Sequence, residues 1–273
     1  TDHPNGEFVT ETTVKNTSLA DVTSFYKTQF VPNNGYLIVI GDIDVAAAKK
    51  TISKQFSDWK KSAAAPSNWK KPATSGSTAI HFVDMPNAVQ SEVSVQNLVD
   101  LPMKSPDYLS ALLANNILGG SSSARLFMNL REDKAFTYGS YSSLGSSKYT
   151  PARFRAYAAV RNAVTDSAAV ELLSEIDRMA SEPVSEDELA MAKAEYVGNF
   201  VMALENPGTV ANYAFRIASE GLPKDFYKTY LSRINNVTPE EVQAAARKYF
   251  TADKAQVVVA GKGRDVLPAL EKM

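Results

Sequence analysis

Residues 18–43, SLADVTSFYKTQFVPNNGYLIVIGDI, align without a gap on residues 238–263, TPEEVQAAARKYFTADKAQVVVAGKG, at a constant offset of 220 positions. Each copy starts with a capping residue and an amphipathic helix that ends at a phenylalanine, Phe30 or Phe250. A polar turn, a β-branched strand and a glycine follow in both copies. A helix-to-strand repeat this far apart predicts two related domains in one chain. The two predicted strands are residues 36–40 and 256–260.

The two copies differ in the amount of sequence that precedes them. The second copy is preceded by 162 residues of globular sequence, residues 76–237, whereas 17 residues precede the first copy. If both copies close domains of equal size, the first domain lacks about 145 residues. Residues 60–78 are rich in Lys, Ala, Ser and Pro, which is a composition typical of a linker. We expect the C-terminal end of a truncated first domain at residues 1–62, the linker at 63–77 and a complete second domain at 78–273.

Bulk composition narrows the class of protein. Hydrophobic residues make up 44% of the 273 residues, which is enough for a packed core. The formal net charge is -1 with both signs interspersed, which argues against nucleic acid and anionic membranes as partners. No apolar run approaches the ~20 residues that span a bilayer. Cysteine is absent, and this leaves a bacterial periplasmic and a cytoplasmic location both open.

The pattern of the second domain predicts an α+β fold. Strand-like runs at residues 79–84 and 90–98 are expected to pair in a sheet, with further strands at 136–145 and 152–161. Helices account for most of the remainder. This order indicates a mostly antiparallel sheet with helices layered on one face. One helix is expected to start at Pro106 and to stop at the glycine pair Gly119-Gly120. Further helices are expected at residues 122–134, 165–176, 211–219 and 226–234, and one starts with a capping box formed by Ser185 and Glu188.

Metal chemistry has little support in the sequence. His3 and His81 are the two histidines, and neither has a glutamate or a second histidine at metal-ligand spacing. We therefore predict no metal site and no cofactor in this chain.

One arginine and one tyrosine form a candidate site. Arg131 closes the helix expected at residues 122–134, and Tyr138 lies seven positions later on the following strand. Across a short helix-to-strand turn, a guanidinium and a phenol can converge on one oxygen of a carbonyl or of its developing oxyanion. The same spacing also suits an arginine beside its helix dipole and a tyrosine packed in a half-buried strand. Spacing alone leaves both interpretations open.

At these residues the chain resembles the pitrilysin/insulinase family of zinc peptidases, whose catalytic helix reads H-x-x-E-H. The resemblance covers nearly the whole chain and implies two homologous α+β domains around a peptide-sized chamber. It also implies zinc in the first domain and an Arg/Tyr pair in the second. The matching segments are Asp2-His3-Pro4 with Gly6, Leu19 to Asp42, Asp84-Met85-Pro86 with Gln90, Ile117 to Gly120, Arg125-Leu126-Phe127, Leu130-Arg131-Glu132 with Tyr138, Asp187-Glu188-Leu189 with Ala192-Lys193, and Gly221-Leu222-Pro223.

Carried over by this resemblance, Arg131 and Tyr138 are the residues that hold the scissile carbonyl and stabilise the tetrahedral intermediate. The H-x-x-E-H motif has no counterpart here, so the chain by itself is expected to be inactive, with zinc in an upstream domain or in a separate subunit. The leading hypothesis is the C-terminal portion of a zinc-dependent endopeptidase that acts on extended peptides. One alternative is a non-catalytic scaffold or partner subunit, and another is a module that binds peptides at a sheet edge.

Overall fold

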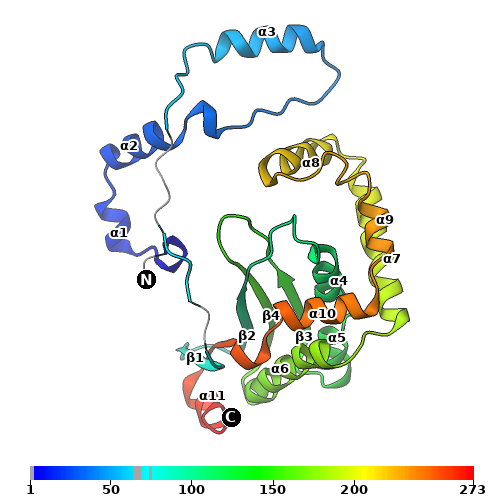
Figure 1. Ribbon diagram of the computed structural model, residues 1–273. Helices are drawn as coiled ribbons and strands as arrows, with labels where there is room; N and C mark the ends of the chain where they lie inside the picture. The colour runs from blue at the N-terminus through cyan, green and yellow to red at the C-terminus, as the bar shows by residue number, and fades with distance from the viewer. Residues whose placement is uncertain (1–2, 64–68, 74–75) are drawn as a thin grey trace. The chain divides into compact units, whose positions relative to one another are not determined.

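The computed structural model describes residues 3–63, 69–73 and 76–273. The chain divides into two compact units (Figure 1). Unit 1 comprises Thr1–Pro72 and Ala203–Ser219, and unit 2 comprises Ala73–Met202 and Glu220–Met273. The linker expected at residues 63–77 lies partly outside the described residues, so the domain limits stay a prediction.

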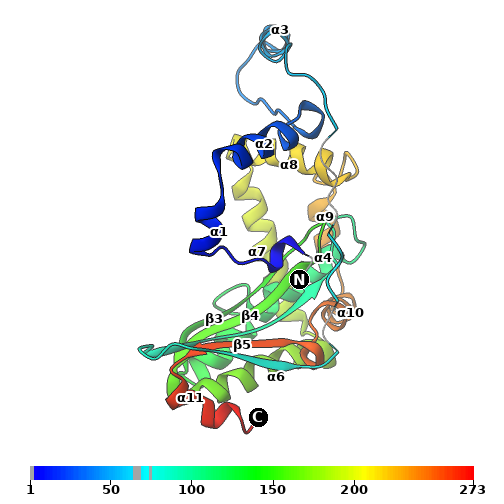
Figure 2. The same ribbon diagram turned by 90° about the vertical axis from the view of Figure 1, so that its left-hand side faces the viewer.

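The sheet of unit 2 has the order β1-β5-β2-β4-β3 in the described part of the chain. The β1–β5 pair is parallel, and the β5–β2, β2–β4 and β4–β3 pairs are antiparallel, which confirms the mostly antiparallel sheet. Strands β1 and β2 were expected to pair, and both belong to this sheet. They do not pair with each other, because the C-terminal strand β5 lies between them (Figure 2). The strands are β1 Ala79–Asp84, β2 Gln90–Val99, β3 Thr137–Leu144, β4 Ala152–Arg161 and β5 Gln256–Gly261.

Helices cover one face of this sheet. Helix α6 contacts β2 and β4, α4 contacts β3, and α10 packs on both α4 and α6 (Figure 2). Residues along β4 and β5 alternate between buried and partly exposed, which is the pattern of a sheet with one covered face. The α+β architecture with helices on one face is therefore confirmed. The helices of unit 2 are α4 Tyr108–Gly119, α5 Arg125–Phe127, α6 Thr165–Ser181, α7 Glu186–Ala203, α9 Tyr230–Asn235, α10 Pro239–Tyr249 and α11 Gly263–Leu270.

The predicted start of one helix differs from the structure. Helix α4 begins at Tyr108 rather than at Pro106, with Asp107 as its N-cap. The carboxylate of Asp107 accepts hydrogen bonds from Lys248 (2.6 Å) and Tyr249 (2.9 Å), so a contact between α4 and α10 holds this end in place. The other end follows the prediction, because α4 stops at Gly119 with Gly120 as its C-cap.

Unit 1 is built from short helices. Its elements are α1 Glu11–Asn16, α2 Leu19–Gln29, α3 Val45–Gln55 and most of α8 Pro207–Glu220. The strand predicted at residues 36–40 is wrong for this structure, because these residues pair with no strand among the described residues. Their counterpart β5 is a strand because β1 and β2 hydrogen-bond to both of its edges.

The repeat nevertheless recurs in local detail. Ser18 and Thr238 cap α2 and α10, and each forms a reciprocal capping box with the acidic residue three positions later. Both helices end with a phenylalanine as the C-cap, and a 3₁₀ turn follows each at the same offset, Pro32–Asn34 and Ala252–Lys254. These caps and turns form in both copies because their hydrogen bonds lie within each segment and do not depend on the surrounding structure.

The two copies differ in burial. Phe30 is 55% exposed, whereas Phe250 is 2% exposed and stacks on Phe154 of β4 with ring centroids 4.2 Å apart. Val39 is 49% exposed, whereas its counterpart Val259 is fully buried. The first copy therefore presents to solvent an apolar face of the kind that the second copy buries. No described helix is long and apolar enough to cross a membrane.

Candidate functional site

The candidate site lies on the helix-to-strand turn between α5 and β3. The single helix expected at residues 122–134 is instead α5 followed without a break by a π-helical turn, Met128–Asp133. The amide of Lys134 donates to the carbonyl of Asn129, five residues earlier, at 3.1 Å. Ala135 then adopts φ 50°, the left-handed conformation that reverses the chain into β3. Such π-helical turns are rare and occur often at functional sites.

Arg131 lies in this π-helical turn with its side chain 46% exposed. Its guanidinium stacks over the ring of Phe127, 4.7 Å from the centroid, and its Nε lies 3.4 Å from the carboxylate of Glu132. Stacking on a buried aromatic ring orients the guanidinium while leaving donors free for a ligand.

Tyr138 is the most exposed part of the candidate site, at 88%. The β3–β4 register shifts between Thr137 and Ser140, so Tyr138 lies in an irregular part of the strand. The hydroxyl of Thr137 donates to the carbonyl of Ala159 at 2.6 Å and accepts the amide of Gly139 at 3.2 Å. These bonds hold the irregular segment in place, while the Tyr138 side chain points into solvent.

Gly139, the next residue, leaves room for the ring of Tyr141. A Cβ built at Gly139 would lie 2.7 Å from the ring of Tyr141, which folds back over the glycine. The structure thus places Arg131 and Tyr138 on one helix-to-strand turn, both open to solvent, and in the described structure neither hydrogen-bonds to the other. The half-buried packing that spacing also allowed does not apply to Tyr138.

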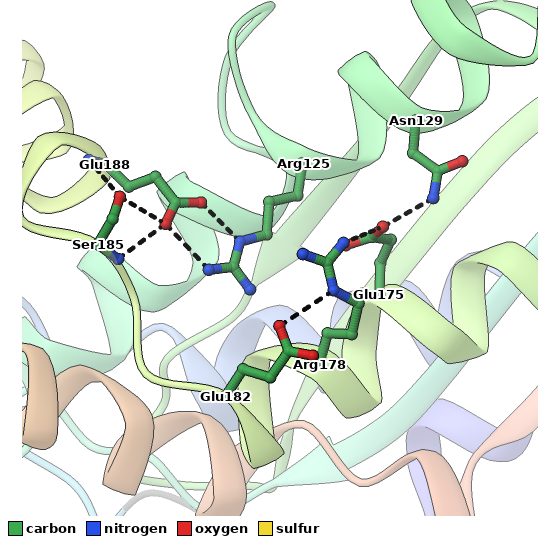
Figure 3. A network of polar contacts seen from close by, with 7 residues as sticks. All are labelled: Arg125, Asn129, Glu175, Arg178, Glu182, Ser185 and Glu188. Carbon is green, nitrogen blue, oxygen red and sulfur yellow. Dashed lines mark hydrogen bonds and ion pairs between the residues drawn. The ribbon is translucent and has the colours of Figure 1, made fainter.

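An ion pair fixes the start of the turn (Figure 3). Arg125 donates from Nε to Glu188 Oε1 at 2.7 Å and from Nη2 to Oε2 at 3.0 Å. The carboxylate of Glu188 also accepts the amide and hydroxyl of Ser185 at 2.9 and 3.0 Å, which confirms the predicted capping box. The hydrogen bonds from Arg125 lower the pKa of Glu188 to about 2.

A second cluster anchors the π-helical turn to α6 (Figure 3). The Asn129 amide donates to Glu175 at 2.7 Å and to Glu171 at 3.0 Å, and Lys134 pairs with Glu171 at 3.2 Å. Glu175 is 2% exposed and accepts two hydrogen bonds from Arg178, at 2.8 and 3.1 Å. Because Asn129 and Lys134 lie on either side of Arg131, α6 holds the segment that carries the candidate arginine.

Sequence reasoning missed these contacts. Arg125 and Glu188 each belong to a recognised pattern, but 63 residues separate them and no local spacing connects them. It also missed a row of aromatic rings in which Tyr141 lies 5.9 Å from Phe127 and 6.3 Å from Tyr157. Arg155 stacks over Tyr157 at 4.3 Å, so arginines lie at both ends of the row.

The peptidase M16 inactive-domain model matches residues 16–196, which is more than half of the chain. The chain belongs to the peptidase M16 inactive-domain family. This result confirms the resemblance to the pitrilysin/insulinase group of zinc peptidases. The matched residues 16–196 include Arg131, Tyr138 and both polar clusters.

Two curated relatives are described as zinc proteases. The chain is 32% identical over 136 residues to an uncharacterized zinc protease of Streptomyces coelicolor. The aligned region covers 49% of this chain and 29% of that protein. It is 26% identical over 155 residues to the uncharacterized zinc protease YmxG of Bacillus subtilis, which covers 56% of this chain and 37% of that protein. The chain therefore matches roughly a third of the length of these relatives.

Solved structures support the fold. A peptidase M16 inactive domain from Pseudomonas fluorescens superposes with a TM-score of 0.82 at 22% identity, covering 92% of this chain and 59% of that one. A protease from Helicobacter pylori gives a TM-score of 0.81 at 17% identity, covering 90% of this chain and 60% of that one. At these identities the likeness concerns the fold alone.

The zinc that M16 peptidases use does not fit the residues of this chain. Among the described residues, no group of three or more His, Asp and Glu side chains could hold a metal ion. His81 Nε2 instead lies 2.7 Å from the side-chain oxygen of Gln256, and the ring of His3 packs edge-on against Trp69. We therefore assign no metal chemistry to these residues.

Proposed function

We propose that this chain is the C-terminal, non-zinc part of a zinc-dependent endopeptidase of the M16 family. Its contribution is to bind an extended peptide and to stabilise the charge that develops on the scissile carbonyl. The observation that carries this proposal is the exposure of Arg131 and Tyr138 on one well-anchored turn. The chain by itself is inactive, because the zinc and the general base belong to another domain or subunit.

The chemistry assigned to the pair follows from its donors. An arginine guanidinium gives charge-assisted hydrogen bonds, and a tyrosine hydroxyl gives a neutral one. Donors that are already oriented stabilise an oxyanion more than a ground-state carbonyl, because the charge develops only as the reaction proceeds. The stacking of Arg131 on Phe127 and the anchoring of Asn129 by α6 support such orientation.

The apolar face of unit 1 supports the existence of a partner domain. Val22, Phe30, Leu37 and Val39 are exposed, while their counterparts at the offset of 220 are buried against β1, β2, α4 and α6. We infer that the first copy packs in the same way against another α+β domain, supplied upstream in the same protein or by a separate zinc-bearing subunit. Contiguous exposed apolar surface typically marks an interaction site.

The test is the turnover of the complete, zinc-loaded enzyme on an unstructured peptide. Replacing Arg131 with Ala is expected to lower kcat by about 100-fold or more, as for the loss of an oxyanion donor. Tyr138→Phe is expected to lower kcat while retaining the ring. The matched control is Arg264→Ala on α11, whose side chain is 77% exposed, and it should leave kcat unchanged. An Arg131→Ala enzyme with normal kcat would remove the assignment.

A second candidate function is a non-catalytic partner that supports a separate active chain. One relative, YmfF of Bacillus subtilis, is described as a probable inactive metalloprotease and is 21% identical over 216 residues. A scaffold needs its partner-binding surface but has no need of Arg131. If the complex is active and insensitive to changes at Arg131 and Tyr138, the scaffold function replaces the proposed stabilisation of the scissile carbonyl by this pair.

A further inference from the structure

The uncovered face of the unit 2 sheet has an unbalanced charge. Side chains that alternate with the buried residues of β4 point away from the helices, and Arg153, Arg155, Tyr157 and Arg161 belong to this set. In the register of the sheet, Tyr141 of β3 lies directly opposite Tyr157 on the same face. We call Tyr141, Arg153, Arg155, Tyr157 and Arg161 the arginine–tyrosine face.

Few acidic residues balance these arginines. Among the outward-facing positions of the five described strands, Glu92 of β2 is the carboxylate, and it pairs in register with Ala159. None of the three arginines forms an ion pair with another described residue. Arg153 donates weakly to the amide oxygen of Gln96 at 3.4 Å, and Arg155 stacks on Tyr157. The face is therefore basic, although the chain as a whole has a net charge of -1.

The spacing of the face suits an extended chain. Arg153 and Arg155 are two positions apart on β4, which places their Cα atoms about 6.6 Å apart. Alternate side chains of an extended peptide have the same spacing, so carboxylates two residues apart can meet both guanidiniums. The rings of Tyr157 and Tyr141, 6.3 Å apart, continue the face with an apolar surface.

We propose that the arginine–tyrosine face binds extended peptides with acidic side chains. The proposal rests on the proposed function for the idea that peptides are the ligands, and it adds their chemical class. Guanidinium–carboxylate pairs supply the preference, and the tyrosine rings accept an apolar or aromatic side chain. Arg131 stacks on Phe127 at the end of the same aromatic row, so a peptide that continues along the row would reach the candidate site of Arg131 and Tyr138.

The test is fluorescence anisotropy with the whole 273-residue chain. Two labelled, unstructured twelve-residue peptides would carry a central Phe and either Glu or Lys at alternate positions. The Glu peptide is expected to bind about tenfold more tightly than the Lys peptide, with affinity that falls as salt rises. Equal binding of the two peptides, or no binding of either at millimolar concentration, would overturn the proposal.

Variants locate the binding site. The double variant Arg153→Gln, Arg155→Gln is expected to weaken binding of the Glu peptide about tenfold, whereas Arg153→Lys, Arg155→Lys keeps the charge and most of the preference. Arg264→Gln removes an exposed charge from α11 and should have no effect. An equal loss with Arg264→Gln would mean that bulk charge, and not this face, determines binding.

Two further outcomes separate this proposal from others. An oligothymidylate that binds the same face more tightly than the Glu peptide would replace the peptide with single-stranded nucleic acid, because arginines and aromatic rings also bind unpaired bases. The peptide assay requires neither zinc nor a partner domain. If the chain shows no preference for the Glu peptide, the turnover test at Arg131 is still valid. If the turnover test fails, the measured peptide binding still holds.

Discussion

Arg125 and Glu188 lie 63 residues apart in the chain, and their side chains meet through two hydrogen bonds of 2.7 and 3.0 Å. The pair joins the start of α5 to the first turn of α7. The Arg125 side chain is 10% exposed, so its charge is largely removed from water. A charge in this position depends on its partner, because an unpaired buried charge is costly.

Replacing Glu188 with Gln should therefore destabilise unit 2. We expect the free energy of unfolding to fall by about 2–3 kcal/mol, because a charge-assisted pair is lost and the guanidinium of Arg125 stays buried. Urea denaturation measures this change. The matched control is Glu182→Gln, which removes a partner of Arg178 at an exposed pair and should cost less than about 1 kcal/mol. Equal effects would show that the Arg125 pair is not special.

The same pair predicts a dependence of stability on pH. The pKa of Glu188 is lowered from 4.5 to about 2 in the folded protein, chiefly by the hydrogen bonds from Arg125. Its stabilising contribution is thus complete above pH 4.5 and is lost as the pH falls from about 4.5 towards 2. Urea unfolding at several pH values should show a smaller slope in this window for Glu188→Gln than for the natural chain. Identical slopes would contradict the assignment.

Ala135 predicts a stabilising substitution. Its φ of 50° is unfavourable for any residue with a Cβ, and glycine adopts it without strain. Ala135→Gly should raise the free energy of unfolding by about 0.5–1 kcal/mol, although glycine also gains entropy in the unfolded chain. The same change at Ala190, an exposed position inside α7, should lower it by about 1 kcal/mol. Thermal unfolding of both variants gives the two signs side by side.

The internal repeat predicts a contrast between two equivalent valines. Val259→Asp places a carboxylate in the fully buried centre of β5 and should prevent unit 2 from folding. Val39→Asp, at the matching and half-exposed position of the first copy, should change the stability of this 273-residue chain by less than about 0.5 kcal/mol. Circular dichroism and urea unfolding measure both effects.

Adding the inferred partner domain should change the result for Val39. If that domain covers residues 36–40, Val39→Asp becomes destabilising in the complete protein. A complete protein that tolerates Val39→Asp as well as the isolated chain does would contradict the inferred packing.

The sequence predicted individual helices and strands correctly where groups close together in the chain determine the bounds of the element. β1 and β4 have the predicted bounds, and α4 ends at its glycine pair. It failed at residues 36–40, where the β-branched pattern is as strong as in β5. A strand needs neighbours for its backbone hydrogen bonds, and no periodicity within the segment reports whether they are present.

The candidate site of Arg131 and Tyr138 could also be predicted from the sequence only in part. Arg131 and Tyr138 could be named from sequence because they lie seven positions apart on one turn. The π-helical turn, the left-handed Ala135 and the anchoring of Asn129 by Glu175 could not be named. They depend on contacts with α6, such as the hydrogen bond from Asn129 to Glu175, which lies 46 positions later in the chain.

The sequence by itself determined the caps, the repeat, the α+β class and the candidate pair, because each depends on groups a few residues apart. Only the tertiary structure decided which copy of the repeat is buried, which strands are neighbours and where the charge gathers. Composition reports a net charge of -1, whereas the fold places three arginines of one strand on the uncovered face of the sheet. The reason is that burial and electrostatic fields depend on distances in space, which the order of residues does not specify.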